Sequence, residues 1–304
     1  MLLAFLLLFW PGAVSLASLW TDSQTESYTH GFLIAAIAAW LLWQRAPQFA
    51  PAMGATPRGW RLAGLLVLGG SALAWQFALR AGIQVAYLSL LPVLLAAGVA
   101  LLLGPRALRA AAFPLGFLYF AMPVWDYVNP LLHWLTIHVV RIGLRLVGIP
   151  SFFSGDLVQI PAGMFEIQGG CSGLHYVIVG LAIAVLLGEL RQDSWRERLR
   201  WIAVGGALAI FSNWVRVFSI IVMGHLTHMQ SYLVRVSHYS YGWFVFMAAL
   251  GAFFWYVARR ARQPSGAAAV VLASTPQPAL AGIAPGLTVT TLIVAAVPAA
   301  MNFA

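Results

Sequence analysis

Long apolar runs separated by short polar stretches make up most of this chain. A helix that crosses a membrane needs about 20 mostly apolar residues, and strands are shorter than these runs. Two runs, 30–44 and 111–124, are short for a full span and are expected to be tilted, extended or partly interfacial. The pattern predicts an all-α polytopic integral membrane protein with about eight or nine transmembrane helices. The runs are 2–19, 30–44, 60–79, 83–103, 111–124, 172–190, 201–224, 241–258 and 283–303.

The two ends of the chain differ from its middle. Small residues at Ser15 and Ala17 resemble a signal-peptide cleavage site, but no basic residues precede the first run, so we expect this helix to be retained. Residues 263–281 are rich in Ala, Pro and Ser, which is typical of a linker. The sequence therefore predicts a transmembrane core over 1–262, a linker over 263–281 and an additional C-terminal transmembrane helix over 282–304.

Residues 129–148 have a different pattern, with polar and apolar positions on opposite helical faces. Arg141 and Arg145 are four residues apart and share one face. The predicted apolar face consists of Leu132, Leu135, Val139 and Ile142. This pattern favours an amphipathic helix at the outer interface, and a span lining a polar interior is the alternative.

A short β hairpin is expected next. Two short runs, Leu157–Ile160 and Met164–Gln168, flank the turn sequence Pro161-Ala162-Gly163. Such a hairpin on the extracytoplasmic side leads the chain directly to Gly169 and Gly170.

Composition agrees with a membrane protein. Only 8% of the residues are charged, 62% are hydrophobic and the mean hydropathy is +0.86, whereas soluble domains average about 25% charged residues. The net charge of +9 would suggest nucleic acid in a soluble protein. Here the basic residues lie between apolar runs, so we expect the lipid bilayer and no nucleic acid as a partner.

Arginine clusters predict the orientation. All 17 basic residues are arginine, and clusters at 45–61, 106–109, 191–200 and 259–262 mark cytoplasmic loops. If the N-terminus is cytoplasmic and each run reverses direction, all four clusters fall inside. Five acidic residues then fall outside, namely Asp22, Glu26, Asp126, Asp156 and Glu166.

The single cysteine, Cys171, excludes an internal disulfide framework, a CxxC redox pair and a cysteine-based zinc site. It lies in the sequence QGGCSGL, between Gln168 and Leu174, at the outer start of a predicted helix. Backbone N–H groups and the dipole at a helix N-terminus favour a thiolate, and paired glycines let a substrate backbone approach closely. Both an inert packed thiol and a reactive thiol fit this position.

Two polar residues on the following helices lie at a similar predicted depth. Arg216 is about 22 Å from Trp201 along a helix, in the outer half of the bilayer. An intramembrane arginine indicates function, and the alternatives are snorkelling or an ion pair with Glu166. His238 opens the next helix, either as an interfacial residue or as part of a site. Cysteine with histidine is the minimum set for thiolate catalysis, and arginine can stabilise an oxyanion.

Other histidines compete for the role of base. His175 follows Cys171 by four residues, which would place both on one helical face, and His30 also lies on the outer side. His225 and His228 would form half a metal site, but no second half is evident, so no metal or other cofactor is expected. We expect the remaining pair, His133 and His138, to serve the interfacial helix.

These stretches resemble the exosortase/archaeosortase family, polytopic membrane enzymes that process proteins with C-terminal Pro-Glu-Pro sorting signals. The resemblance covers roughly residues 1–260. Its main motifs are Cys171-Ser172-Gly173-Leu174, Asn213 with Arg216, and His238 with Gly242-Trp243. Secondary motifs are Tyr28-Thr29-His30-Gly31-Phe32-Leu33 and Met122-Pro123.

The resemblance implies a cysteine transpeptidase or peptidase in a bacterial inner membrane, with its active site on the periplasmic side. It implies that Cys171 is the nucleophile, Arg216 a transition-state or substrate-positioning residue and His238 the acid and base. Membrane-anchored proteins with C-terminal sorting signals would be the substrates. A thioester at Cys171 would pass to an acceptor nucleophile, such as a polysaccharide or a lipid. The further candidates are His175, Asn213, Glu166 and His30.

Two other classes of protein are alternatives. A transporter or flippase of anionic polysaccharide precursors would use Arg216 and the histidines to line a path, but its polar residues should spread through the bilayer. Here they gather at one depth, which favours the enzyme. A serine intramembrane protease is disfavoured because the sequence has no GxSxG stretch.

Overall fold

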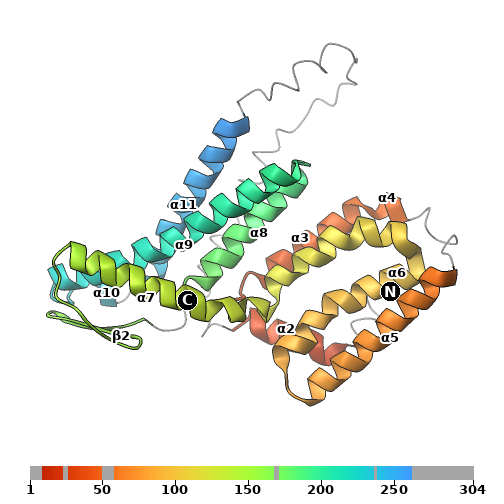
Figure 1. Cartoon of the computed structure of the whole chain (residues 1–304), viewed down its shortest axis with the longest axis horizontal. Coiled ribbons are helices and arrows are strands. Elements are labelled where there is room, and N and C mark those ends of the chain that lie inside the picture. Colours follow the sequence, from red (N-terminus) through yellow and green to blue (C-terminus); the bar gives the residue numbers. More distant parts are fainter. Residues whose placement is uncertain (1–8, 23–26, 50–57, 168–170, 236–237, 262–304) are drawn as a thin grey trace, which may run out of the picture. The chain divides into compact units, whose positions relative to one another are not determined.

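The computed structural model of the chain describes residues 9–22, 27–49, 58–167, 171–235 and 238–261. The chain divides into two compact units, residues 1–257 and 258–304, and the second contributes only the last turn of α11 to the described residues. The first unit is helical apart from one small sheet (Figure 1). Its elements are α2 (Trp10–Trp20), α3 (Gly31–Gln44), α4 (Ala46–Phe49), α5 (Arg58–Arg80), α6 (Gln84–Phe117), η2 (Leu118–Ala121), η3 (Pro123–Val128), α7 (Asn129–Leu146), β1 (Phe152–Ser154), β2 (Leu157–Ile160), β3 (Gly163–Glu166), α8 (Leu174–Leu190), α9 (Trp195–Leu226), α10 (Tyr232–Arg235) and α11 (His238–Ala261).

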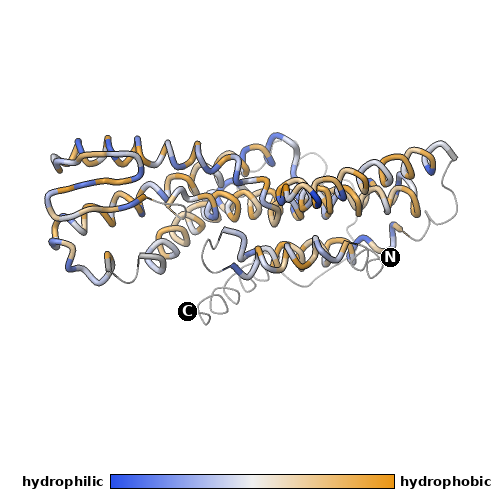
Figure 2. Tube along the Cα trace, turned by 90° about the horizontal axis from the view of Figure 1, so that it is seen from below, coloured by the Kyte–Doolittle hydropathy of each residue, from blue (hydrophilic) through white to orange (hydrophobic). Residues whose placement is uncertain are grey.

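Apolar residues cover most of the length of the helices (Figure 2). On α5, Leu66, Leu73 and Phe77 are 67%, 75% and 73% exposed, as expected of side chains that face lipid rather than water. Four helical segments are long and apolar enough to cross a membrane, namely 59–80, 84–121, 195–226 and 240–260, and α3 and α8 are shorter apolar helices. The polytopic helical membrane class is therefore confirmed. The total of eight or nine spans stays a prediction, because the last predicted span, the linker before it and the start of the first span lie outside the described residues.

The segment labelled α6 is a helical hairpin rather than one long helix. Gly104 has a φ of 84° and a ψ of −176°, which only glycine adopts readily, and Pro105 follows it. The Tyr119 hydroxyl donates to the Ser89 carbonyl at 3.0 Å, although 30 residues of straight helix would separate them by about 45 Å. Val99 also packs in one cluster with residues of the second arm. The two separate runs predicted here, 83–103 and 111–124, are thus confirmed as antiparallel arms.

Helix α9 packs antiparallel to both α8 and α11. Gly180 of α8 lies against Gly205 and Ala209 of α9, and small residues at this crossing let the two backbones approach closely. At the same crossing, the ring of Phe253 from α11 lies 3.6 Å from the Cβ position of Gly205. Further along, the hydroxyls of Ser219 and Tyr241 share a 2.8 Å hydrogen bond. Because of this packing, the N-terminal ends of α8 and α11 lie beside the middle of α9.

Helix α7 forms where the sequence predicts it, and it packs on α9. The side chains that α7 buries against the protein are displaced by part of a turn from its predicted apolar face. Ile142 is 56% exposed, whereas Thr136 is fully buried. Thr136 can be buried because its hydroxyl accepts a hydrogen bond from Asn213 on α9, a partner that periodicity along α7 does not reveal. The side chains that are buried are Leu132, Thr136, Val140 and Leu144.

The predicted hairpin is present and has one more strand. Strands β1, β2 and β3 form an antiparallel sheet in that order, with Phe153 opposite Val158 and Val158 opposite Phe165. The sheet packs against the last turns of α9, because Phe165 lies 2.3 Å from the Cβ position of Gly224. The Ile167 carbonyl accepts a hydrogen bond from His133 of α7 at 2.6 Å. This contact fixes the chain just before it continues towards Cys171.

Three of the four predicted arginine clusters meet at one end of the helices. Arg45 at the end of α3 donates to the Ala110 carbonyl at 2.8 Å and pairs with Glu189 of α8. Glu189 also pairs with Arg198 of α9 at 2.6 Å. A common side for these clusters is therefore confirmed. Which side of the membrane this end faces stays a prediction.

Candidate active site

The Cys171 segment is held by a side-chain amide from α9. The Asn213 Nδ2 donates to the Cys171 carbonyl at 2.8 Å, and Asn213 is 1% exposed. Gly173, which lies between Cys171 and α8, has a φ of 82° and begins the helix from a left-handed conformation. A Cβ atom at Gly173 would lie 2.5 Å from Asn213 Cγ. Both the backbone conformation and the contact with Asn213 therefore require glycine in this motif.

Cys171 itself is partly buried and precedes α8 by three residues. Its side chain packs beside the buried cluster that contains Val140 of α7, Ile167 and Val217 of α9. The expectation that Cys171 and His175 share a helical face is wrong, because regular helix begins only after the left-handed Gly173. The cysteine is thus positioned by tertiary contacts with α7 and α9.

Arg216 lies one turn beyond Asn213 on the same helix. It is 2% exposed, and its guanidinium carbon is 5.8 Å from the centre of the Tyr176 ring on α8. Burial among protein side chains contradicts the alternative of an arginine that snorkels to lipid headgroups. A cation over an aromatic face is stabilised by the ring quadrupole. The same helix therefore carries both the anchor of Cys171 and a buried cation.

The first turns of α11 complete the arrangement. A Cβ atom at Gly242 would lie 2.2 Å from the Tyr176 hydroxyl and 2.7 Å from Arg216 Nε, so this helix approaches Arg216 as closely as glycine permits. His238 begins α11 one turn before Gly242, but its side chain lies outside the described residues. The backbone of the His238 segment is thereby brought next to Arg216.

His175 is in the first turn of α8, and its ring centre lies 4.0 Å from that of Tyr176 and 6.1 Å from that of Trp243 on α11. His175 therefore faces the aromatic residues between α8 and α11. It stays a candidate base beside His238.

The secondary motifs form a support for this region. The Tyr28 hydroxyl donates to Asp126 Oδ1 at 2.8 Å, and burial together with this carboxylate raises the pKa of Tyr28. His30 Nε2 donates to the Phe120 carbonyl at 2.9 Å, and burial lowers the pKa of His30. Burial thus favours the uncharged form of the His30 imidazole. The buried Met122 lies between Phe120 and Asp126, so both predicted secondary motifs meet here.

Several sequence candidates lie on other elements or at other positions. Glu166 is an exposed residue at the end of β3. His138 bonds to its own helix at Trp134. His225 and His228 lie at the far end of α9, and within the described ranges no group of three or more His, Cys, Asp or Glu side chains could hold a metal ion.

Sequence reasoning missed Tyr176 and Asp126 as partners in the site. Tyr176 contacts Arg216 and Gly242 and stacks on Phe246 at 4.9 Å. Its position two residues after Leu174 of the cysteine motif was the available signal. Asp126 was predicted only as one of several extracytoplasmic acidic residues.

The helices and the converging segments define a polytopic membrane protein with one polar cluster around Cys171, Asn213 and Arg216. A family model described as "Transmembrane exosortase (Exosortase_EpsH)" matches residues 20–255, which is more than two thirds of the chain. The chain therefore belongs to the transmembrane exosortase family, and the resemblance inferred from the motifs is confirmed. At the level of the family, this membership indicates a role in the processing of sorting signals. No curated protein matches the chain, and no solved structure does.

Proposed function

We propose that this protein is a membrane-embedded cysteine transpeptidase or peptidase. Its substrates are exported, membrane-anchored proteins with C-terminal Pro-Glu-Pro-type sorting signals. The observation that carries the proposal is the hydrogen bond from Asn213 to the Cys171 carbonyl, one turn from the buried Arg216. In the proposed orientation the N-terminus is cytoplasmic and this cluster is on the periplasmic side of the inner membrane.

In the proposed reaction, the Cys171 thiolate attacks the scissile carbonyl carbon and the carbonyl electrons move to oxygen. The Arg216 guanidinium stabilises this oxyanion in surroundings where water does not screen it. The intermediate collapses, the C–N bond breaks, and the His238 imidazolium gives its proton to the leaving amine. The acyl group is then bound to sulfur as a thioester.

The second half-reaction releases the product. Neutral His238 takes a proton from an acceptor nucleophile, such as a hydroxyl of a polysaccharide, an amine of a lipid headgroup or water. The acceptor attacks the thioester, the C–S bond breaks and the thiolate is regenerated. His175 and His30 are the alternatives for the base, and the histidine substitutions described below separate them.

The test is co-expression with a protein from the same genome that has a Pro-Glu-Pro motif, a transmembrane segment and a basic tail. The intact mass of that substrate is compared at matched expression for wild type, Cys171→Ala, Arg216→Ala and His238→Ala. His175→Ala and His30→Ala test the competing bases. His138→Ala is the control, because His138 bonds only to its own helix among the described residues.

We expect loss of processing in the first three variants and wild-type processing in the control. Hydroxylamine, which cleaves thioesters, should release the acyl group of the thioester intermediate from wild type, whereas Cys171→Ala should have no such acyl group to release. Processing that continues in Cys171→Ala would contradict the thiol mechanism and favour a transporter of anionic polysaccharide precursors. Loss of processing in His175→Ala, with processing kept in His238→Ala, would indicate that the base is His175 on α8.

A further inference from the structure

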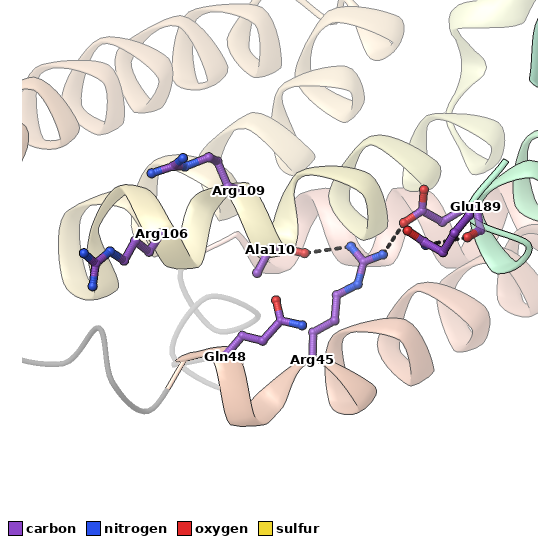
Figure 3. A pocket seen from close by; sticks show the side chains of 7 residues that line it. Arg45, Gln48, Arg106, Arg109, Ala110 and Glu189 are labelled. Atoms are coloured by element: carbon purple, nitrogen blue, oxygen red, sulfur yellow. Dashed lines mark hydrogen bonds and ion pairs between the residues drawn. The ribbon is translucent and has the colours of Figure 1, made fainter. Parts of the chain in front are cut away.

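A pocket lined by arginine lies at the opposite end of α8 from Cys171. The 17 residues of α8 separate the two ends by about 25 Å. Its volume is about 690 Å³, within the usual range of about 300–1,000 Å³ for ligand sites. The lining residues are Arg45, Gln48, Arg106, Arg109, Ala110, Glu189 and Gln192 (Figure 3).

The charges in this pocket do not balance. Arg45 is engaged by Glu189 and the Ala110 carbonyl, and Glu189 is engaged a second time by Arg198. Arg106 and Arg109 are exposed, and neither forms an ion pair within the described part of the chain. In Figure 3 both project from the same helical arm without a bonded partner, while Arg45 reaches Glu189. The pocket therefore carries two guanidinium groups in excess.

The α6 hairpin explains why these two arginines lie together. Gly104 turns the chain at the hairpin tip, and Arg106 and Arg109 follow within the first turn of the second arm. Residues three apart on a helix point to the same side. The buried Ala107 fixes the rotation of this arm, so both arginines face outward.

The surroundings of the pocket are apolar. Leu102, just before the hairpin tip, is 58% exposed, and Trp43, two residues before Arg45, is 76% exposed. Exposed tryptophan next to arginine is typical of the headgroup level of a membrane, where the ring lies at the interface and the cation meets phosphate. Basic pockets between membrane helices bind the headgroups of anionic lipids.

We infer that this pocket binds a phosphate group, and that its source is the headgroup of an anionic phospholipid. Arg106 and Arg109 each present a planar fork of N–H donors that matches the phosphodiester oxygens. Gln48 and Gln192 supply amide groups for the polar remainder of the headgroup. The site is distant from Cys171, and it does not depend on the proposed reaction.

The test uses the full chain, purified in detergent, with lipid binding measured by native mass spectrometry. Phosphatidylglycerol and phosphatidylcholine are added separately, each with and without inorganic phosphate as a competitor, to wild type, to the double variant Arg106→Gln/Arg109→Gln and to Arg196→Gln. The last is the control, since Arg196 is exposed near the same end but does not line the pocket. Unchanged circular dichroism shows that the variants fold, because the replaced side chains are exposed.

We expect wild type to prefer phosphatidylglycerol over phosphatidylcholine, and the double variant to bind phosphatidylglycerol roughly thirtyfold more weakly. The control should keep wild-type affinity. Wild-type affinity in the double variant would overturn the site. If inorganic phosphate competes fully and phosphatidylglycerol has no advantage over phosphatidylcholine, the pocket binds a free anion and the lipid source is overturned.

Discussion

The two ends of α8 are stabilised in different ways. At the Cys171 end, neighbouring side chains lie 2.2–2.5 Å from the positions that Cβ atoms would take at Gly173 and Gly242, so only glycine fits there. The side-chain amide of Asn213 holds the backbone of the cysteine. At the Glu189 end, arginines from α3 and α9 pair with one carboxylate, and Arg198 is only partly buried. The first end therefore depends on shape, and the second depends on charge.

This difference predicts different responses to substitution. A close-packed contact is disrupted when a single methyl group is added, because the surrounding side chains can make room for it only if the backbone moves. A partly exposed ion-pair cluster loses little when one charge is removed, since water solvates the charges that remain. Substitutions at the Cys171 end should therefore abolish activity, whereas those at the Glu189 end should leave it intact.

The largest effect is expected for Gly173→Ala. The left-handed φ and the contact with Asn213 should together lower the free energy of unfolding by about 2–5 kcal/mol. Denaturant unfolding measures this loss, and substrate processing should be lost as well. Gly148→Ala is the matched control, since Gly148 also has a positive φ of 74° but no described residue within 4 Å of its Cβ position. Equal losses in both variants would show that the Asn213 contact contributes nothing.

Gly242→Ala should come next. The added methyl would meet the Tyr176 hydroxyl and Arg216, pushing α11 outward at a cost of about 1–3 kcal/mol. The rate of substrate processing should fall more than the thermal midpoint of the protein. Gly251→Ala tests the same helix at a glycine with open space, and it should leave stability equal or higher by up to about 1 kcal/mol. Wild-type activity in Gly242→Ala would contradict close packing at the site.

Asn213→Ala probes the hydrogen bond rather than the shape. Loss of the donor removes a hydrogen bond from the Cys171 carbonyl, which costs about 1–3 kcal/mol, and misplacement of the nucleophile should lower processing about 100-fold. Ser212→Ala is the neighbouring control, because among the described residues the Ser212 hydroxyl donates only to the Ala209 carbonyl of its own helix, at 2.7 Å. A fall in stability without a fall in processing would make Asn213 purely structural.

Glu189→Gln should have the smallest effect. Two partly exposed ion pairs are weakened, which we expect to cost about 1 kcal/mol, and processing per folded molecule should not change. High salt should reduce the difference from wild type, since exposed charges are screened. Lost processing here, measured with the same substrate assay, would mean that the two ends are coupled and that the contrast between them is wrong.

Much of the fold follows from hydrophobic periodicity. The arms of α6 were predicted as separate runs because arginines interrupt the apolar pattern at 106–109, and α3 was predicted with almost its observed limits. The face of α7 was not predicted, since the burial of Thr136 depends on Asn213, a residue 77 positions away. Periodicity describes one helix at a time, and it does not include such a partner.

The site could be predicted in its residues but not in its contacts. The motif containing Cys171 and the helix containing Asn213 and Arg216 were identified as candidates, and the structure joins them by one hydrogen bond. Gly173 and Gly242 were visible only as members of motifs. A glycine in a sequence does not reveal which side chain lies against it, so the roles of Asn213 and Tyr176 required the folded chain.

The α6 hairpin also has a consequence for how the protein enters the bilayer during synthesis. Its arms are joined by the Gly104 turn, packed on each other and linked by the bond from Tyr119 to Ser89. They can therefore partition into lipid together, as one preassembled unit. In the proposed orientation the tip of the hairpin stays on the cytoplasmic side, where the ribosome is. Neither Arg106 nor Arg109 therefore has to cross the hydrocarbon core, where each arginine would cost about 2.5–3.5 kcal/mol of transfer free energy.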